Sequence, residues 1–298
     1  MLSSQGPRPV LINLLISLRP GQWTKNFFVF AALVFAQRLN DRNAVIKAVI
    51  AFVVFCALSA AVYLVNDVLD REHDRRHPLK SHRPIASGAL SPALAVTAAA
   101  ALALVGMIVA LSLGWLFFEM SAAYVVLLWA YSAFLKHVVI LDVLTIAGGF
   151  TLRATAGAAA ITVPISHWLL VCTMLLALFI ALSKRRHELT FLSAMASGHR
   201  PILGDYTPYL LDQMISVVTA STLVAYAFYT ISPETTAKFG TDLLSLTIPF
   251  PLYGIFRYLY LVHRHDQGGS PAELVINDRP LLVCVGLWAL SVIAIIYR

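Results

Sequence analysis

AVIAFVVFCALSAAVYLVNDVLDREHDRR, residues 48–76, runs from a long apolar stretch directly into a cluster of charged side chains. The apolar part is long enough to cross the ~30 Å hydrocarbon layer of a membrane as a helix. At its end, Asp67, Asp70 and Asp74 recur at spacings that place them on one helical face. Carboxylates so close repel one another unless a cation binds among them, and Mg²⁺ shares oxygen ligands readily with substrate phosphates. The stretch therefore predicts a metal and diphosphate site where a membrane helix reaches the surface.

The whole chain has the composition of a multi-pass membrane protein. Of its 298 residues, 59% are hydrophobic and 12% are charged, and the mean hydropathy of +0.78 lies outside the range of soluble domains. We therefore predict an all-α bundle of nine transmembrane helices that forms a single domain over residues 1–298. The apolar runs cover about residues 20–37, 43–66, 91–113, 115–134, 139–160, 165–183, 209–231, 243–262 and 279–297.

Lys and Arg collect in alternate loops of this arrangement, as the positive-inside rule requires, if the N-terminus is cytoplasmic. The loops on that side are also the more polar ones, which predicts an inner (plasma) membrane protein whose active site faces the cytoplasm. The net charge of +7 is accounted for by holding these loops at an anionic leaflet, so we expect no nucleic-acid partner. The inner segments are residues 67–90, 135–138, 184–208 and 263–278.

The acidic cluster is costly in this position without a ligand, because three acids and the Asn66 amide begin inside an apolar helix. Asp67 and Asp70 are the predicted metal contacts, and Asp74 is a third ligand or acts through water. The alternative interpretation is a solvated helix end whose charges extend toward water.

Lys80 and Arg83 follow on a loop. Beside a metal site, a lysine point charge and an arginine fork suit the remaining phosphate oxygens, so both are predicted to neutralise a leaving diphosphate. Taken alone, they would be ordinary positive charge on a cytoplasmic loop.

A second charged cluster, LSKRRHEL at residues 182–189, closes the sixth run. Its basic character suits a ligand with more phosphate than one Mg²⁺ can neutralise, and Lys184, Arg185 and Glu188 are its candidate binding residues. A structural alternative is an ion pair between Lys184 and Glu188, which lie one helical turn apart.

Arg153 lies near the middle of the fifth run, where a charge costs at least ~2.5 kcal/mol. It therefore needs an acidic or phosphate partner and should face a cavity. The remaining substrate-binding candidates lie near the cytoplasmic ends of their runs, and an interfacial aromatic is the alternative role for the tyrosine among them. They are Lys25, Asn26, Tyr131, Lys136 and Asp142.

The motifs RPGQWTKN (19–26), NDVLDREHD (66–74), YSAFLK (131–136) and LDVLTIAGGFTLRATAGA (141–158) resemble those of the UbiA-type intramembrane prenyltransferase superfamily, over nearly the whole chain. Typical members bind a polyprenyl diphosphate through two Asp-rich motifs with Mg²⁺ and prenylate an aromatic acceptor. Here LSKRRHEL replaces the second Asp-rich motif. With that replacement, the chain is similar to the decaprenyl-phosphate phosphoribosyltransferase branch of the superfamily.

This resemblance implies a Mg²⁺-dependent pentosyltransferase. Phosphoribosyl pyrophosphate would donate its 5-phosphoribosyl group to decaprenyl (polyprenyl) phosphate, releasing diphosphate and yielding a precursor of cell-wall arabinan. Lys184 and Arg185 would then bind the 5-phosphate, and Arg153 with Lys25 would place the lipid phosphate. The alternatives are transfer of a polyprenyl chain to an aromatic acceptor and transport of a lipid phosphate, and a homo-oligomer is left open.

Overall fold

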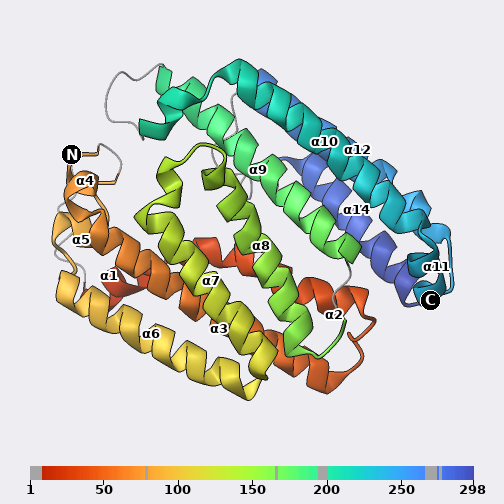
Figure 1. Cartoon of the computed structure of the whole chain (residues 1–298), viewed down its shortest axis with the longest axis horizontal. Helices are drawn as coiled ribbons and strands as arrows, with labels where there is room; N and C mark the ends of the chain where they lie inside the picture. The colour runs from red at the N-terminus through yellow and green to blue at the C-terminus, as the bar shows by residue number, and fades with distance from the viewer. Residues whose placement is uncertain (1–8, 78–79, 165–166, 194–200, 266–273, 275–276) are drawn as a thin grey trace.

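The computed structural model describes residues 9–77, 80–164, 167–193, 201–265, 274 and 277–298, and every regular element in these ranges is a helix (Figure 1). This confirms the predicted all-α class. Parts of the predicted inner loops 67–90, 184–208 and 263–278 lie outside the described residues. The α-helices are α1 (Val10–Ser17), α2 (Ala31–Phe35), α3 (Arg42–Leu69), α4 (Arg71–Arg76), α5 (Pro84–Ser87), α6 (Pro92–Ser112), α7 (Trp115–Ala133), α8 (Leu141–Ala160), α9 (His167–Ser193), α10 (Pro208–Ile231), α11 (Pro233–Phe239), α12 (Pro249–His265) and α14 (Arg279–Ile296). The 3₁₀ helices are η1 (Pro20–Phe30), η2 (Leu135–His137), η3 (Pro201–Asp205) and η4 (Leu243–Thr247).

Seven helices in the described part of the chain are long and apolar enough to cross a membrane, namely α3, α6, α7, α8, α9, α10 and α14. A further pair, Pro233–Phe239 with Leu243–Val262, is bent by 104° and makes an eighth if counted as one span. The prediction of nine spans is therefore not confirmed.

The predicted run 20–37 is not a single helix, because the chain forms η1 and then the short α2. Pro20 and Gly21 open η1, and both are poor residues for a continuous α-helix. Arg19, just before them, has left-handed backbone angles (φ 52°) that separate η1 from α1. The predicted run 243–262 is likewise divided, with Pro249 starting α12 after η4.

Helix α8 is the central element and the most buried of the candidate spans. It packs against η1, α2, α3, α7 and α9. Small side chains on its second half allow this, and a Cβ atom at Gly157 would lie only 2.0 Å from the carbonyl oxygen of Val29 in η1. The two backbones are therefore in direct contact, as small residues permit at membrane helix interfaces.

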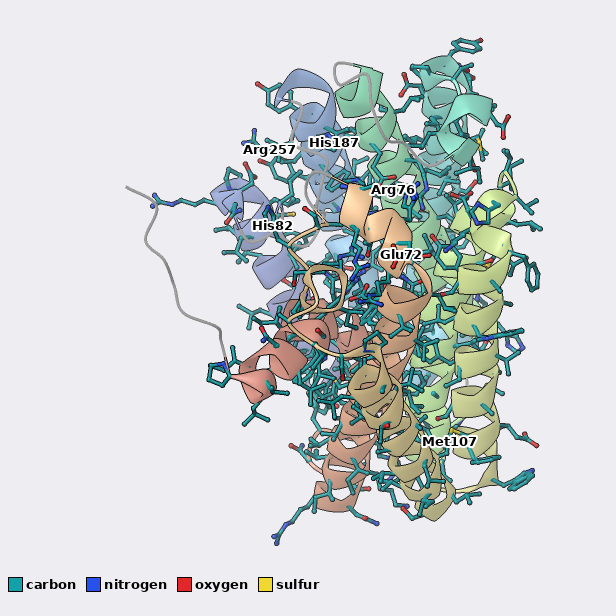
Figure 2. All side chains as sticks on the ribbon, turned by 90° about the vertical axis from the view of Figure 1, so that its left-hand side faces the viewer. Glu72, Arg76, His82, Met107, His187 and Arg257 are labelled. Atoms are coloured by element: carbon teal, nitrogen blue, oxygen red, sulfur yellow. The ribbon has the colours of Figure 1, made fainter. Side chains whose placement is uncertain are left out.

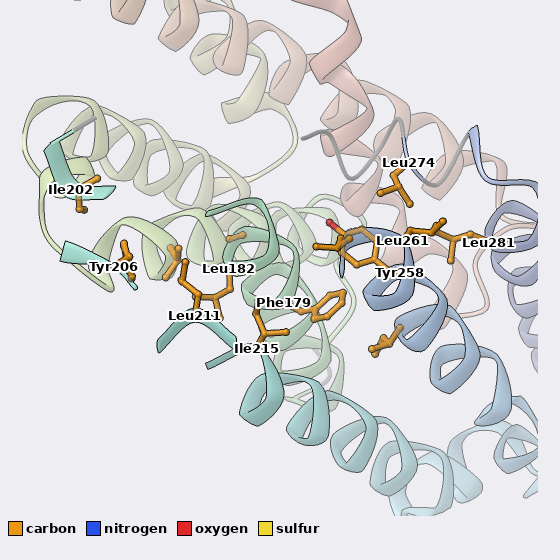
Figure 3. Close-up of a cluster of buried hydrophobic side chains, with 14 residues drawn as sticks. Phe179, Leu182, Ile202, Tyr206, Leu211, Ile215, Tyr258, Leu261, Leu274 and Leu281 are labelled. Atoms are coloured by element: carbon orange, nitrogen blue, oxygen red, sulfur yellow. The ribbon is translucent and has the colours of Figure 1, made fainter. Parts of the chain in front are cut away.

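Two large hydrophobic clusters flank α8. One joins α3 and α7 through Phe55, Phe117 and Tyr124. The other joins α9, α10 and α12, where Phe179 and Tyr258 pack edge to face (Figure 3). The two clusters therefore pack on opposite sides of α8, which lies between α7 and α9 (Figure 1).

Helix α1 buries polar side chains and exposes apolar ones, the reverse of an amphipathic helix in a soluble protein. Its Asn13 and Ser17 side chains are buried, and Asn13 Nδ2 donates to the carbonyl of Ala89 at 3.3 Å. Val10 and Leu11 are instead more than half exposed. An apolar outer face of this kind suits contact with lipid, as expected for an interfacial helix.

The ends of α3, α7 and α9 and the start of α8 gather on one side of the molecule, at the upper left of Figure 1. The side view shows Glu72, Arg76 and His187 toward this end, whereas Met107 of α6 lies toward the other end (Figure 2). Charged groups from distant parts of the sequence are thus brought together at one end of the bundle.

The contact between α8 and η1 predicts the effect of Gly157→Ala. The added methyl group would overlap the Val29 carbonyl, so we expect a loss of about 1–3 kcal/mol in stability. A thermal unfolding series on the purified protein would measure it. Gly286→Ala in α14, where a Cβ meets nothing within 4 Å, is the matched control. Equal melting temperatures for the two variants would contradict the described packing.

Candidate functional site

An acidic pair lies at the end of α3 and the start of the charged segment that follows it. Asp67 and Asp74 are both buried, and Nη1 of Arg83 contacts Oδ1 of Asp67 at 3.1 Å and Oδ2 of Asp74 at 2.6 Å. Arg19 donates a second, short hydrogen bond to Oδ1 of Asp67. Two carboxylates from α3 and α4 are therefore neutralised by two arginines from elsewhere in the chain.

Asp70 does not join this pair. Its Oδ1 accepts from Lys136 Nζ at 3.2 Å and its Oδ2 from the Asn66 amide at 3.1 Å. Asp67 and Asp74 are about two turns apart at 3.6 residues per turn, so they share a face more closely than either does with Asp70. Within the described ranges, no three His, Cys, Asp or Glu side chains form a group that could hold a metal ion. Asp70 is therefore directed to Lys136, and its predicted role as a metal ligand beside Asp67 and Asp74 stays a prediction.

Arg19 is a site residue that the sequence analysis did not single out. Its guanidinium also lies over the Tyr63 ring, 5.0 Å from the centroid, so it is held from two sides. A non-glycine residue in the left-handed region is uncommon and is found most often where the surroundings over-determine it. The only sequence signal for its role was its position before Pro20 and Gly21.

The predicted site residue Lys80 acts electrostatically on His77, three residues after Asp74. Partial burial of His77, and next the charge of Lys80, lower the pKa of this histidine, while Asp74 acts in the opposite direction. The charges of Lys80 and Asp74 thus act on the same imidazole.

The basic cluster on α9 is organised around Arg185, which is buried. Its Nε donates to Asp142 Oδ2 of α8 at 2.7 Å, its Nη1 pairs with Glu188, and its Nη2 lies 3.4 Å from the Tyr131 hydroxyl of α7. Two carboxylates already contact its guanidinium, and the predicted role of Arg185 as a phosphate ligand stays a prediction. Arg185 fastens α7, α8 and α9 together.

Tyr206 completes this network and was not foreseen, since nothing in its local sequence points to Asp142. Its hydroxyl donates to Asp142 Oδ1 at 2.7 Å and accepts from the Ile140 backbone N–H at 2.8 Å. Burial raises the pKa of Tyr206 to about 12, so the group remains a proton donor to the carboxylate. Ile140 has φ 71°, a costly angle for a β-branched residue, at the start of α8.

Arg153 lies deep in the bundle, as expected, but its partners are neutral. Nε donates to Asn26 Oδ1 at 2.8 Å, Nη2 to the Tyr124 hydroxyl at 2.6 Å and Nη1 to the Gly149 carbonyl at 3.0 Å. The Tyr124 ring also faces the guanidinium, 4.6 Å from its centroid. Among the described residues no carboxylate pairs with Arg153, so its positive charge is not compensated by an anion.

Lys25 lies within electrostatic range of residues from both charged clusters, the one at Asp67 and the one on α9. It lies half-buried on η1, and the positive charges of Lys184, Arg153 and Arg19 all act on its ammonium group. No described carboxylate lies within salt-bridge distance of Lys25. Lys184, about half exposed, is 4.0 Å from Glu188, the pair that the sequence spacing suggested. Lys25 is therefore under the influence both of Lys184 on α9 and of Arg19, which contacts Asp67 of α3.

The acidic pair fits a divalent cation. One oxygen of Asp67 and one of Asp74 already approach the same positively charged atom of Arg83, and carboxylate oxygens are the ligands that Mg²⁺ prefers. Arg19 contacts Asp67 of this pair, and a guanidinium suits phosphate oxygens. The arrangement can hold a ligand with several phosphates beside a metal ion.

Comparison with known proteins gives a match over most of the chain. The sequence model of the UbiA prenyltransferase family matches residues 26–277. A decaprenyl-phosphate phosphoribosyltransferase from Corynebacterium glutamicum is 32% identical, over 98% of this chain and 89% of the relative. One from Mycolicibacterium smegmatis is 31% identical, over 98% of this chain and 94% of the relative.

A similar fold is present in a solved structure. A UbiA homologue from Archaeoglobus fulgidus, bound to GPP and Mg²⁺, superposes with a TM-score of 0.73 over 96% of this chain and 100% of that one, at 19% identity. The helical arrangement described above is therefore that of a UbiA fold.

Removing a carboxylate should destabilise the protein more at the buried Asp142–Arg185 pair than at a more exposed ion pair. Asp142→Asn should lower stability by roughly 3 kcal/mol, because Arg185 would keep a buried charge with one carboxylate fewer. Asp212→Asn removes a carboxylate from the more exposed Arg186–Asp212 pair, and we expect a change below about 1 kcal/mol. Thermal unfolding of both variants measures the difference, and similar losses would refute a structural role for Arg185.

Proposed function

Since the chain belongs to the UbiA prenyltransferase family and, within it, to the decaprenyl-phosphate phosphoribosyltransferases, we propose that it transfers a 5-phosphoribosyl group from phosphoribosyl pyrophosphate to a polyprenyl phosphate, with release of diphosphate. This conclusion rests on the sequence identity of 31–32%, over 98% of the chain, to relatives of that name. The product would serve the synthesis of cell-wall arabinan.

The diphosphate of the donor binds at the acidic pair. Bound there through Asp67 and Asp74, Mg²⁺ would neutralise charge on the diphosphate as it leaves. Arg83 contacts both carboxylates and Arg19 contacts Asp67, so their N–H groups, together with Lys80 on the following loop, would donate to the phosphate oxygens. Stabilising a leaving group in this way lowers the barrier without any proton transfer.

The 5-phosphate of the donor binds at Lys184. This lysine is the accessible cation of the α9 cluster, whereas Arg185 is buried between Asp142 and Glu188. The positive charge of Lys184 acts on Lys25, which in turn lies within electrostatic range of Arg19. A donor with phosphates at both ends would therefore extend from the acidic pair to Lys184 of the α9 cluster.

The lipid phosphate binds at Lys25, with Arg153 behind it. Both cations lack a described carboxylate partner, and an anion between them would relieve their mutual repulsion. The phosphate is already an anion at neutral pH, so it can attack C1 of the ribose without a general base. Catalysis is then mainly positioning and electrostatic stabilisation.

The basic cluster on α9 argues against transfer of a polyprenyl chain from its diphosphate to an aromatic acceptor. A second Asp-rich motif would have to offer carboxylates to a second metal, but Asp142 and Glu188 are paired with Arg185. Transport of a lipid phosphate is disfavoured as well, because most of the candidate site residues, apart from Arg153 and the η1 residues Lys25 and Asn26, lie at or near helix ends rather than at a central helix break.

The protein is an integral, multi-pass membrane protein, and we place the site on its cytoplasmic side. Positive charge concentrates around this end, as the positive-inside rule predicts for cytoplasmic loops. The soluble donor would then enter from the cytosol, and the lipid acceptor from the bilayer.

The reaction is tested by supplying the purified protein with Mg²⁺ and phosphoribosyl pyrophosphate labelled in the ribose. Label should appear in a lipid-soluble product only when polyprenyl phosphate is present. Asp67→Asn should reduce the rate at least about 100-fold, since a carboxamide is a poor Mg²⁺ ligand. Glu72→Gln, which changes an exposed acid of the same segment, is the matched control and should remain active. Absence of lipid-soluble label from the wild type would reject the proposed donor.

The two phosphate sites are separated by steady-state kinetics. Lys184→Ala should raise the KM for the sugar donor about tenfold and leave the KM for the lipid nearly unchanged, because a charge-assisted hydrogen bond to one substrate is lost. Lys25→Ala should do the reverse. If both variants affect the same substrate, the assignment of the two lysines is wrong.

A further inference from the structure

The position of Arg83 implies a control on when the metal can bind. Its Nη1 atom contacts one oxygen of Asp67 and one of Asp74, the same two oxygens that would bind a cation between them. We propose that Arg83 is a built-in counter-cation that occupies the metal position until a metal–diphosphate complex arrives. The acidic pair would then bind metal and diphosphate together, and not metal alone. This inference rests on the proposed function.

Charge balance supports an exchange of this kind. Asp67 and Asp74 carry two negative charges, and Arg19 with Arg83 carries two positive ones, so the buried cluster is neutral as it stands. A divalent cation entering alone would have to displace a guanidinium that then has no anion to pair with, which is costly at a buried site. A diphosphate supplies that anion, because the displaced arginine can donate to its oxygens.

The structure allows the Arg83 side chain to move while its backbone stays in place. Arg83 is the first flanking residue of α5, and the next residues are anchored, with Ile85 fully buried and the Ala86 carbonyl bonded to Arg75 Nε at 2.9 Å. The Arg83 side chain is 28% exposed, compared with 2% for Asp74. The guanidinium can therefore turn toward a ligand while the carboxylates remain where they are.

Arg19 would remain on Asp67 during this exchange. It contacts the same Oδ1 atom from a segment 48 residues earlier in the chain and is additionally held by the Tyr63 ring. Arg19 is about as exposed as Arg83 (26%), so it is the contact with Tyr63 that would make Arg19 the fixed cation and Arg83 the mobile one. The exchange would keep free Mg²⁺ from occupying the site before the donor is present.

Metal binding without turnover tests this. The full-length protein in detergent would be mixed with Mn²⁺ as the probe, with or without inorganic pyrophosphate, and passed through a filter that retains only the protein. We expect the wild type to retain Mn²⁺ at least about tenfold more tightly with pyrophosphate than without it. Equal affinities in the two conditions would overturn the proposal.

Arg83→Gln provides the second measurement, with its folding checked by thermal unfolding. This variant should bind Mn²⁺ alone about tenfold more tightly than the wild type, because the carboxylates have lost their counter-cation, and should gain less from pyrophosphate. Arg76→Gln removes the same charge from an exposed position on α4 and should behave as the wild type (Figure 2). An unchanged affinity of Arg83→Gln for Mn²⁺ alone would also overturn the proposal.

These outcomes are separable from those of the reaction assay. If Mn²⁺ is retained with pyrophosphate but phosphoribosyl pyrophosphate yields no labelled lipid, the counter-cation role of Arg83 stands and the assigned reaction fails. If labelled lipid forms but Mn²⁺ binds equally well alone, the reaction stands and the role of Arg83 fails.

Discussion

Carboxylates inside an apolar bundle require cations beside them, and this requirement organises the charged end of the protein. Asp67 and Asp74 are compensated by Arg19 and Arg83, and Asp142 by Arg185. The Arg19–Asp67 and Arg185–Asp142 pairs, separated by 48 and 43 residues, also join segments that are distant in sequence. Deep burial makes such pairs costly to break and weak as a net source of stability. Their value here is that they fix which helix ends face one another.

Helix α8 places the neutral and cationic parts of the site relative to each other. Its small residues admit η1 to backbone contact, and η1 carries Lys25 and Asn26. The side-chain amide of Asn26 in η1 accepts a hydrogen bond from Arg153 of α8. The strained turn at Ile140 positions the start of α8 against Tyr206. One helix thus supports groups at the membrane surface and groups well inside the bundle.

Much of this could be predicted from the sequence, because membrane spans are long and apolar and because Lys and Arg sort by side. The acidic and basic ends of the second and sixth apolar runs were recognised from composition and spacing alone. The division of the first run was not, since hydropathy does not distinguish an α-helix from a 3₁₀ helix that begins with Pro20. Arg19 and Tyr206 were missed because their partners lie far along the chain. The burial of Arg185 between carboxylates could not be read from a pattern that looks the same for an exposed basic cluster.

The inverted helix α1 ties the reaction centre to its lipid surroundings. Val10 and Leu11 face outward, and Arg19 follows α1 closely enough that the seating of this helix determines where its guanidinium lies. Only Leu18 lies between the end of α1 and Arg19, so a helix with an outward apolar face leads directly into the contact with Asp67.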